Sequence, residues 1–335
     1  MRVGSNPQKF DKKIDLETHH RVIVVVYIPN EDGFYKNSYD VFKLCLDSLV
    51  SSTNTNCAIT IVNNGSSSKV TNLLNEYLEN DKIDTVIHHK RNIGKIDALI
   101  GAARGTREQL ITYSDSDILF LKGWQENVEK LFTSFPNVGA VSPIPVRKGI
   151  FAFTSSVLVS ILSNKVKFRF QSIPNNFDTY NRYLESINWD LETDDKKLWP
   201  VVYKNSAKAI IGSGHQVLTI SRDIALKFTP LAPSLILVGG DSENNYVDRP
   251  IDLSGKLRLS TFENYAYHMG NTLEEWMLDE YKIKLKTKVE ISIDKEIIKK
   301  IGVTPYSKIK LKIYSLRKRI AKKIFKFKYK KSTNY

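Results

Sequence analysis

The sequence predicts an α/β protein in which a doubly wound, mostly parallel sheet is followed by a basic amphipathic helical tail. Two observations predict this fold class. Strand patterns alternate with helical patterns from residue 21 to about residue 142, as in parallel sheets covered by helices on both faces. Residues 297–335 contain 14 Lys and Arg and no acidic residue, and their apolar residues recur at helical spacing.

The first part of the chain consists of consecutive strand–helix units. Residues 21–28, RVIVVVYI, form a continuous β-branched run that Pro29 ends, which is typical of a strand buried on both faces. Helical spacing of apolar residues follows at 42–49. The second predicted strand, 57–62 (CAITIV), is closed by the turn sequence NNGS at 63–66.

The alternation continues along the chain. Helical patterns at 70–78, 96–103 and 124–135 separate strand patterns at 83–88, 110–114 and 138–141. Parallel sheets bind ligands at the carboxyl ends of their strands, so we expect the chemistry in the loops after Ile28, Val62 and Ser114. The first strand is not followed by Gly-x-Gly-x-x-Gly, and the sequence contains no P-loop, which counts against both kinds of phosphate-binding turn.

The second part of the chain has a weaker pattern. We expect an irregular insertion or lid at about 150–208, order again at 209–220, a helix capped by Ser221, and short strands at 256–262 and 265–268. The predicted division of the chain is a polar lead-in at 1–20, an α/β half at 21–145, a second half at 146–275 and a helical basic tail at 276–335.

Composition excludes several classes of protein. No apolar run reaches the ~18 residues that cross a bilayer, and the first twenty residues hold no apolar core of a signal peptide, so we expect a cytoplasmic protein. Cys45 and Cys57 lack metal-site spacing and are too few for a disulfide framework, so we expect two reduced thiols. Because residues 297–335 hold 14 of the 50 Lys and Arg and none of the 36 Asp and Glu, residues 1–296 are neutral, which counts against a body that binds nucleic acid.

The tail combines an apolar stripe with many positive charges. The stripe consists of Ile309, Ile313, Leu316, Ile320, Ile324 and Phe327. A basic amphipathic helix of this kind suits an anionic membrane surface, because its apolar face enters the headgroup boundary while its lysines meet phosphate. A helix docked on the protein's own body is the main alternative, and binding to nucleic acid or to another protein is the third.

A pair of aspartates, Asp115 and Asp117, closes the predicted strand at 110–114. Two carboxylates at i and i+2 after a buried strand can converge on one divalent cation and leave coordination positions open for phosphate oxygens. A solvated turn or a helix cap is the alternative for so short a motif. The position at a strand end of an α/β domain favours the metal site.

Six sequence blocks follow one another in a specific order. They are RVIVVVYIP at 21–29, IVNNGSS at 61–67, NIGKIDALIGA at 92–102, LITYSDSDILFLKGW at 110–124, VGAVSP at 138–143 and GKLRLSTFENYAYHMGN at 255–271. In this order they resemble a family 2-type glycosyltransferase of the GT-A (nucleotide-diphospho-sugar transferase-like) fold. The resemblance covers residues 21–275, and it makes the half at 21–145 the binding site of a nucleotide sugar and the half at 146–275 that of the acceptor.

The resemblance implies roles for individual residues. Asp117 would be the main metal ligand, Asp115 would hold the ribose or a metal-bound water, and His268 would be a further ligand of Mn²⁺ or Mg²⁺. The implied donor-binding residues are Pro29, Asn30, Asn63, Asn64, Lys95, Ser114 and Asp115. The family often has Asp where this chain has Asn63, and an amide also donates hydrogen bonds, so the preferred nucleotide base stays open.

The resemblance is weakest at the catalytic base. Inverting members use a carboxylate to take the proton of the acceptor hydroxyl, usually within a Glu-Asp pair shortly before an Arg. Here the segment 239–243 reads GGDSE, with Arg249 downstream, and the pair is missing. Asp241 follows flexible glycines and is our first choice. Glu243 better fits the usual distance to the arginine and is the second, and two surface carboxylates in a polar loop are the alternative.

These residues together imply a function. The protein would transfer a sugar from a nucleotide sugar to a carbohydrate or lipid-linked acceptor with inversion, in bacterial surface polysaccharide assembly, held by its tail on the inner membrane face. An inactive GT-A-like scaffold at the membrane is the alternative, because of Asn63 and the missing Glu-Asp pair. A nucleotidyltransferase is the third reading, although it would need a glycine-rich basic loop where residues 29–37 read PNEDGFYKN.

Overall fold

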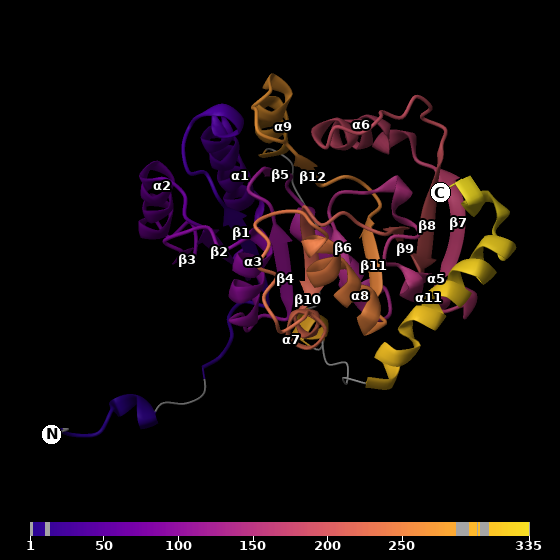
Figure 1. Cartoon of the computed structure of the whole chain (residues 1–335), viewed down its shortest axis with the longest axis horizontal. Coiled ribbons are helices and arrows are strands. Elements are labelled where there is room, and N and C mark those ends of the chain that lie inside the picture. Colours follow the sequence, from indigo (N-terminus) through magenta and orange to yellow (C-terminus); the bar gives the residue numbers. More distant parts are fainter. Residues whose placement is uncertain (1–2, 11–13, 286–294, 300, 302–307, 335) are drawn as a thin grey trace.

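A ten-stranded sheet forms the centre of the computed structural model, which describes residues 3–10, 14–285, 295–299, 301 and 308–334 (Figure 1). Its strands are β1 (His20–Val26), β2 (Cys57–Asn63), β3 (Thr85–His88), β4 (Leu110–Ser114), β6 (Val138–Ser142), β7 (Lys167–Ser172), β8 (Leu198–Lys204), β9 (Ala207–Ile211), β10 (Val217–Ser221) and β11 (Leu257–Thr261). A separate pair consists of β5 (Ile118–Phe120) and β12 (Ala266–His268). The helices are α1 (Ser38–Ser52), α2 (Ser68–Glu79), α3 (Lys95–Arg104), α4 (Trp124–Ser134), α5 (Ser155–Leu162), α6 (Phe177–Ser186), α7 (Arg222–Lys227), α8 (Arg249–Ser254), α9 (Glu275–Leu285), α10 (Lys295–Lys299) and α11 (Lys308–Lys328), with a π-helical turn, η5 (Asn244–Asp248), before α8.

The order of the strands places the ends of the predicted ligand-binding strands together. The order is β3-β2-β1-β4-β10-β6-β11-β9-β8-β7, and seven of the ten strands run in the same direction. β1 is parallel to both neighbours, with Val26 opposite Asn63 of β2 and Val24 opposite Ser114 of β4. The loops that follow these strands therefore leave the sheet side by side. The predicted doubly wound, mostly parallel sheet is confirmed.

Helices cover both faces of the sheet. Val22, Val24 and Val26 of β1 belong to a buried cluster that includes α1, α2 and α4, whereas Ile23 and Val25 belong to a second cluster that includes α3, α7 and α8. This alternation follows from the pleat, because successive side chains of a strand point to opposite faces. Since both faces are covered, the central strands are continuous apolar runs.

The region expected to be an irregular insertion, at about 150–208, is more regular than predicted. It contains α5, β7, α6 and β8, and β8 and β7 extend the sheet at one edge. The residues of β7 are all exposed or half-buried, so the sequence KFRFQS lacks the apolar run of a central strand. The predicted run at 209–220 is two strands, separated by a loop that begins at Gly212 with φ +90°.

The basic tail helix α11 packs against α5 and α8, near the edge of the sheet that ends in β7 (Figure 1). Its docked face consists of Tyr314, Ala321 and Phe325, of which the most exposed is Tyr314 at 7%. The predicted apolar stripe is a different face. Ile313, Leu316, Ile320, Ile324 and Phe327 are 46–85% exposed, and the side chain of Ile309 lies outside the described residues. The helix is therefore docked on the body while most of the stripe faces solvent.

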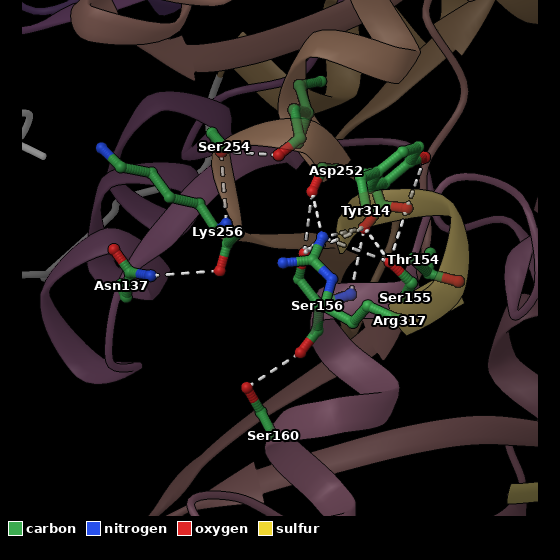
Figure 2. A network of polar contacts seen from close by, with 12 residues as sticks. Asn137, Thr154, Ser155, Ser156, Ser160, Asp252, Ser254, Lys256, Tyr314 and Arg317 are labelled. Carbon is green, nitrogen blue, oxygen red and sulfur yellow. Dashed lines mark hydrogen bonds and ion pairs between the residues drawn. The ribbon is translucent and has the colours of Figure 1, made fainter. Parts of the chain in front are cut away.

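One buried carboxylate fixes α11 to the body (Figure 2). Asp252 of α8 is fully buried. It accepts hydrogen bonds from the hydroxyl of Ser155 at 2.8 Å and from the hydroxyl of Tyr314 at 2.9 Å. The guanidinium of Arg317 donates to the backbone oxygen of Asp252 at 2.6 Å. Because a buried carboxylate needs hydrogen bonds to all its oxygens, α5, α8 and α11 stabilise one another through this residue.

Two further predictions concern the whole chain. Among the described helices, none has the length and apolarity needed to cross a bilayer. Cys45 and Cys57 are free and buried, and burial raises the pKa of both thiols. Neither cysteine is therefore placed to act as a reactive thiolate.

Candidate active site

The two aspartates after β4 lie where strands of the large sheet end. The backbone N–H of Asp115 donates to the carbonyl oxygen of Gln216 at 2.8 Å, in the loop before β10. β5 follows directly and pairs with β12, which places His268 opposite Ile118. The N–H of Met269 donates to the carbonyl oxygen of Asp117 at 2.8 Å. These backbone contacts bring His268 to the aspartates from a distant part of the sequence.

Asp115, Asp117 and His268 form a cluster with the geometry of a metal site. Each offers one ligand atom, and these atoms lie within 4.8 Å of one another. Nε2 of His268 is 3.4 Å from Oδ2 of Asp117, while Nδ1 lies 2.9 Å from the hydroxyl oxygen of Ser186. A contact to the second ring nitrogen orients an imidazole toward a metal in the same way in known sites.

Asp117 has an unsatisfied oxygen inside this cluster. Its Oδ1 is buried and has no hydrogen-bond partner among the described residues. Burial raises the pKa of Asp117, and although His268 opposes this shift, the neighbouring Asp115 adds to it. A buried carboxylate oxygen without a partner is costly. A divalent cation would supply the missing contact, and two carboxylates with one imidazole are a suitable set for Mn²⁺ or Mg²⁺.

Lys95 bridges the aspartates to the predicted base segment. Its Nζ is 2.7 Å from Oδ1 of Asp115 and 3.7 Å from Oε1 of Glu243. Burial disfavours the ammonium, but Asp115 and Glu243 outweigh this effect and raise the pKa of Lys95. Gly94 allows the backbone at Ile236 to lie close to the residue before Lys95. Its φ is +95°, and a Cβ there would lie 2.4 Å from the backbone oxygen of Ile236.

The structure separates the two candidate bases. The side chain of Glu243 is 13% exposed and lies beside Lys95, which also pairs with Asp115. Asp241 is exposed, its φ is +62°, and its carboxylate accepts a hydrogen bond from Asn244 at 2.9 Å. Asp241 faces a different cavity, which α11 helps to line. Of the two predicted bases, the structure therefore brings the second choice, Glu243, to the aspartates, and not the first.

Asn63 and Asn64 are buried at the end of β2. The amide group of Asn63 donates to the hydroxyl of Thr71 at 3.1 Å, and its carbonyl oxygen accepts from the N–H of Ser66 at 2.9 Å. Asn64 donates to Oδ1 of Asn92 at 2.9 Å, in the loop that leads to Gly94 and Lys95. Both side chains are therefore engaged in holding the loops around the strand ends.

The other predicted donor residues lie on neighbouring strand ends. Pro29, half-buried, and Asn30, exposed, follow β1, and the preceding Ile28 accepts a hydrogen bond from the N–H of Ser67 at 2.9 Å. Ser114 is buried and its hydroxyl donates to the carbonyl oxygen of Asp115 at 2.8 Å. Asn30 after β1 is thus exposed, while Ser114 supports the backbone at the aspartates.

Part of the chain is similar to a known protein family. Residues 33–191 match the model of the family described as glycosyl transferase family 2. This match covers just under half of the 335 residues, and it shows that this part of the chain is similar to glycosyltransferases of that family. The matched segment holds Lys95, Asp115 and Asp117, whereas Glu243 and His268 lie outside it.

Solved structures of glycosyltransferases are similar at low sequence identity. A mannosyltransferase, PcManGT from Pyrobaculum calidifontis in complex with GDP-Man and Mn²⁺, is 16% identical over 72% of this chain and 54% of that chain, with a TM-score of 0.41. TarS 1–349 from S. aureus in complex with UDP-GlcNAc is 11% identical over 81% and 68%, with a TM-score of 0.39. GalNAc-T7 with UDP, GalNAc and Mn²⁺ is 13% identical over 74% and 42%, with a TM-score of 0.42. This chain thus spans about half the length of the mannosyltransferase (54%). A comparison with curated proteins found no match to this chain.

One charged group next to the loop that holds Asp115 was missed by the sequence analysis. Nδ1 of His215 lies 3.4 Å from the buried carboxylate of Asp248, which also pairs with Arg258 at 2.8 Å. Burial raises the pKa of Asp248, but Arg258 and His215 outweigh it, so the pKa lies below its ordinary value. His215 precedes Gln216, whose carbonyl holds Asp115. The sequence feature that could have revealed this group is a charged residue, Arg258, within the strand sequence KLRLS.

Proposed function

We propose that the protein is a glycosyltransferase that uses a divalent metal ion to move a sugar from a nucleotide sugar to a glycan or a lipid-linked acceptor. One observation carries the proposal. Asp115, Asp117 and His268 converge at strand ends in a chain that is similar over residues 33–191 to family 2 glycosyltransferases, and an oxygen of Asp117 is left without a partner there. Mn²⁺ or Mg²⁺ held by these residues would neutralise the charge that develops on a leaving nucleoside diphosphate.

The strand ends next to the aspartates suit the nucleotide. The loops after β1, β2 and β4 adjoin one another, and they carry Asn30, Asn64 and Asp115. Lys95 supplies a positive charge between Asp115 and Glu243, and an ammonium in this place suits the phosphates of a donor. These residues would bind and orient the donor with its sugar directed toward Glu243.

We assign the role of general base to Glu243. An oxygen of the acceptor hydroxyl bonds to the anomeric carbon of the donor sugar while the bond from this carbon to the diphosphate oxygen breaks. The proton of the hydroxyl passes to the Glu243 carboxylate, which lies on the side of Lys95 and Asp115. A single displacement of this kind inverts the configuration at the anomeric carbon.

The tail suits a protein that works at a membrane surface. The solvent-facing stripe of α11 lies next to a basic surface, and the tail at 297–335 has no acidic residue. This combination favours in-plane binding to anionic lipids at the inner membrane face. Such a position suits the addition of sugars to lipid-linked intermediates of a bacterial surface polysaccharide.

A screen of nucleotide sugars tests the proposal. Thermal unfolding would be followed with UDP-, GDP-, dTDP- and CMP-sugars, each with and without Mn²⁺, because a ligand that binds only the folded state raises the apparent Tm. We expect a shift with one nucleotide that requires Mn²⁺ and disappears in Asp117→Asn. A variant of an exposed carboxylate, Asp241→Asn, serves as the control and keeps the shift.

Each outcome has a distinct meaning. A metal-dependent shift together with transfer to an acceptor supports the enzyme. A metal-dependent shift without transfer or donor hydrolysis points to the inactive scaffold. No shift with any nucleotide contradicts a donor site at Asp115 and Asp117.

A further inference from the structure

A second cavity lies between α11 and the segment that carries the candidate base. Its volume is about 550 Å³. It is bounded by η5 and α8 on one side and by the middle of α11 on the other. Its charged lining residues are Asp241, Arg249, Lys318, Arg319 and Lys322. We call it the basic cavity.

The charges of the basic cavity are not balanced. It has four cations and one carboxylate, and Asp241 is exposed, with its carboxylate already hydrogen bonded to Asn244 at 2.9 Å. Within the described part of the chain, Arg249, Lys318, Arg319 and Lys322 form no ion pair within 4.0 Å. Four neighbouring positive charges repel one another, and a bound anion relieves this repulsion. Arg and Lys side chains together are the usual ligands of phosphate groups.

The basic cavity is adjacent to the candidate active site. Asp241, Asn244 and Asn245 line it, while Glu243 of the same segment turns to Lys95. Two residues of chain span at most about 7 Å, so the backbone at Asp241 and the backbone at Glu243 are close. A molecule that places its phosphates in the basic cavity therefore lies beside the residue to which we assign the acceptor's proton.

The opposite flank of α11 is apolar. A groove there is lined by Val159 and Leu162 of α5 and by the apolar stripe of α11. α11 thus separates an apolar groove from the basic cavity. Lipids that carry phosphate have both hydrocarbon and phosphate groups, and simple soluble sugars have neither.

We propose that the basic cavity binds the phosphate groups of a lipid-linked acceptor, and that it thereby selects acceptors in which the sugar is attached to a lipid phosphate or diphosphate. This inference rests on the proposed function, because it places the acceptor next to Glu243. The same cations could instead bind the phosphate of a membrane phospholipid. The position beside Glu243 favours the acceptor.

Direct binding tests the basic cavity apart from catalysis. The probe is geranyl diphosphate, titrated into the full-length protein in the presence of EDTA so that a metal-dependent donor site does not contribute. We expect the double variant Arg249→Ala/Arg319→Ala to bind it at least about tenfold more weakly, because the variant removes two charged hydrogen-bond donors for phosphate. Lys323→Ala/Lys328→Ala removes the same charge from exposed positions on α11 outside the cavity, and should bind as the unchanged protein does.

Kinetics with two acceptors then identify the source of the phosphate. We call Arg249→Ala/Arg319→Ala the cavity variant. With a glycan on a short lipid diphosphate as the acceptor, its KM for the acceptor should be about tenfold higher than that of the unchanged protein, while kcat and the donor-induced Tm shift stay the same. With the same glycan lacking phosphate, the variant and the unchanged protein should agree. Equal KM values for the phosphorylated acceptor would overturn the proposal.

Vesicles containing phosphatidylglycerol test whether the cavity binds a membrane phospholipid instead. If the cavity variant loses vesicle binding but keeps its affinity for geranyl diphosphate, the phosphate belongs to a membrane phospholipid and the acceptor assignment is wrong. If the unchanged protein shows no donor-induced Tm shift, the proposed function is contradicted. The titration with geranyl diphosphate in EDTA does not depend on a donor, so it tests the basic cavity separately.

Discussion

At the scale of single residues, the choice of base depends on where two neighbouring carboxylates point. Asp241 and Glu243 are two positions apart, but only Glu243 lies beside Lys95, which also pairs with Asp115. We expect Glu243→Gln to lower kcat by about 10²–10⁴-fold, because a general base contributes roughly this factor. The donor-induced Tm shift should remain, since the change removes no predicted metal ligand.

Asp241→Asn is the matched change for this prediction, because it also converts a carboxylate to an amide in the same segment. We expect it to keep kcat within about threefold, since the proton would pass to Glu243. The measurement is initial velocity at saturating donor and acceptor. A large loss of kcat in Asp241→Asn with activity kept in Glu243→Gln would reverse the assignment.

At the scale of elements, the central strands were predictable and the edge of the sheet was not. Residues 21–28, 57–62 and 110–114 are apolar because both faces are covered, so their composition alone marks them as strands. β7 has no such signal, because its residues are exposed or half-buried at the edge. The aspartates followed from the strand end and the resemblance, but the choice between Asp241 and Glu243 needed the backbone path, including the positive φ of Asp241.

The tail helix shows a second limit of sequence patterns. The apolar stripe of α11 was expected to contact a membrane surface, or alternatively to dock on the body. The helix does dock on the body, but through other residues, Tyr314, Ala321 and Phe325. The docked face is held by the polar contacts of Tyr314 and Arg317 with Asp252. Periodicity detects apolar residues only, so the polar contacts of Tyr314 and Arg317 that help to choose this face over the stripe are not visible in it.

Ion pairs around Glu192 hold the irregular segment between α6 and β8. Glu192 pairs with Arg147 and Lys197, and Nζ of Lys148 lies 3.5 Å away. Burial opposes its ionisation, but Lys197 and Arg147 outweigh it and lower the pKa of Glu192 to about 2. Since the folded pKa lies below the ordinary value of 4.5, this stability is present above about pH 4.5 and is lost as the pH falls toward 2.

Glu192→Gln should therefore lower the free energy of unfolding by about 2 kcal/mol at pH 7. This value allows for the weakening of the ion pairs by solvent at the exposed lysines. The difference should shrink by pH 3. Urea unfolding at both pH values measures it, and Asp190→Asn, which removes an exposed carboxylate from the same segment, should change little at either pH. A constant difference across this range would show that Glu192 acts through packing and not through its charge.

At the scale of the whole molecule, the net charge is concentrated at one end of the chain. Residues 1–296 are neutral and the tail carries the entire net charge of +14. An anionic surface therefore attracts the side of the molecule on which α11 lies. Because α11 is docked through Asp252 and packs on α5 and α8, the body would be held in a defined orientation and not tethered at random.

Replacement of two residues of the exposed stripe tests this orientation. Leu316→Asp/Ile320→Asp should reduce binding to vesicles containing phosphatidylglycerol at least about tenfold, because it places two carboxylates in the apolar face and weakens the charge attraction. The fold should be kept, since these side chains are 57% and 46% exposed. Leu231→Asp/Leu278→Asp makes the same chemical change at two exposed leucines outside α11, and vesicle sedimentation should show near-normal binding. If both double variants bind less by the same factor, net charge alone explains the attraction; because the control keeps the stripe intact, only a selective loss in the first variant assigns the contact to the outer face of α11.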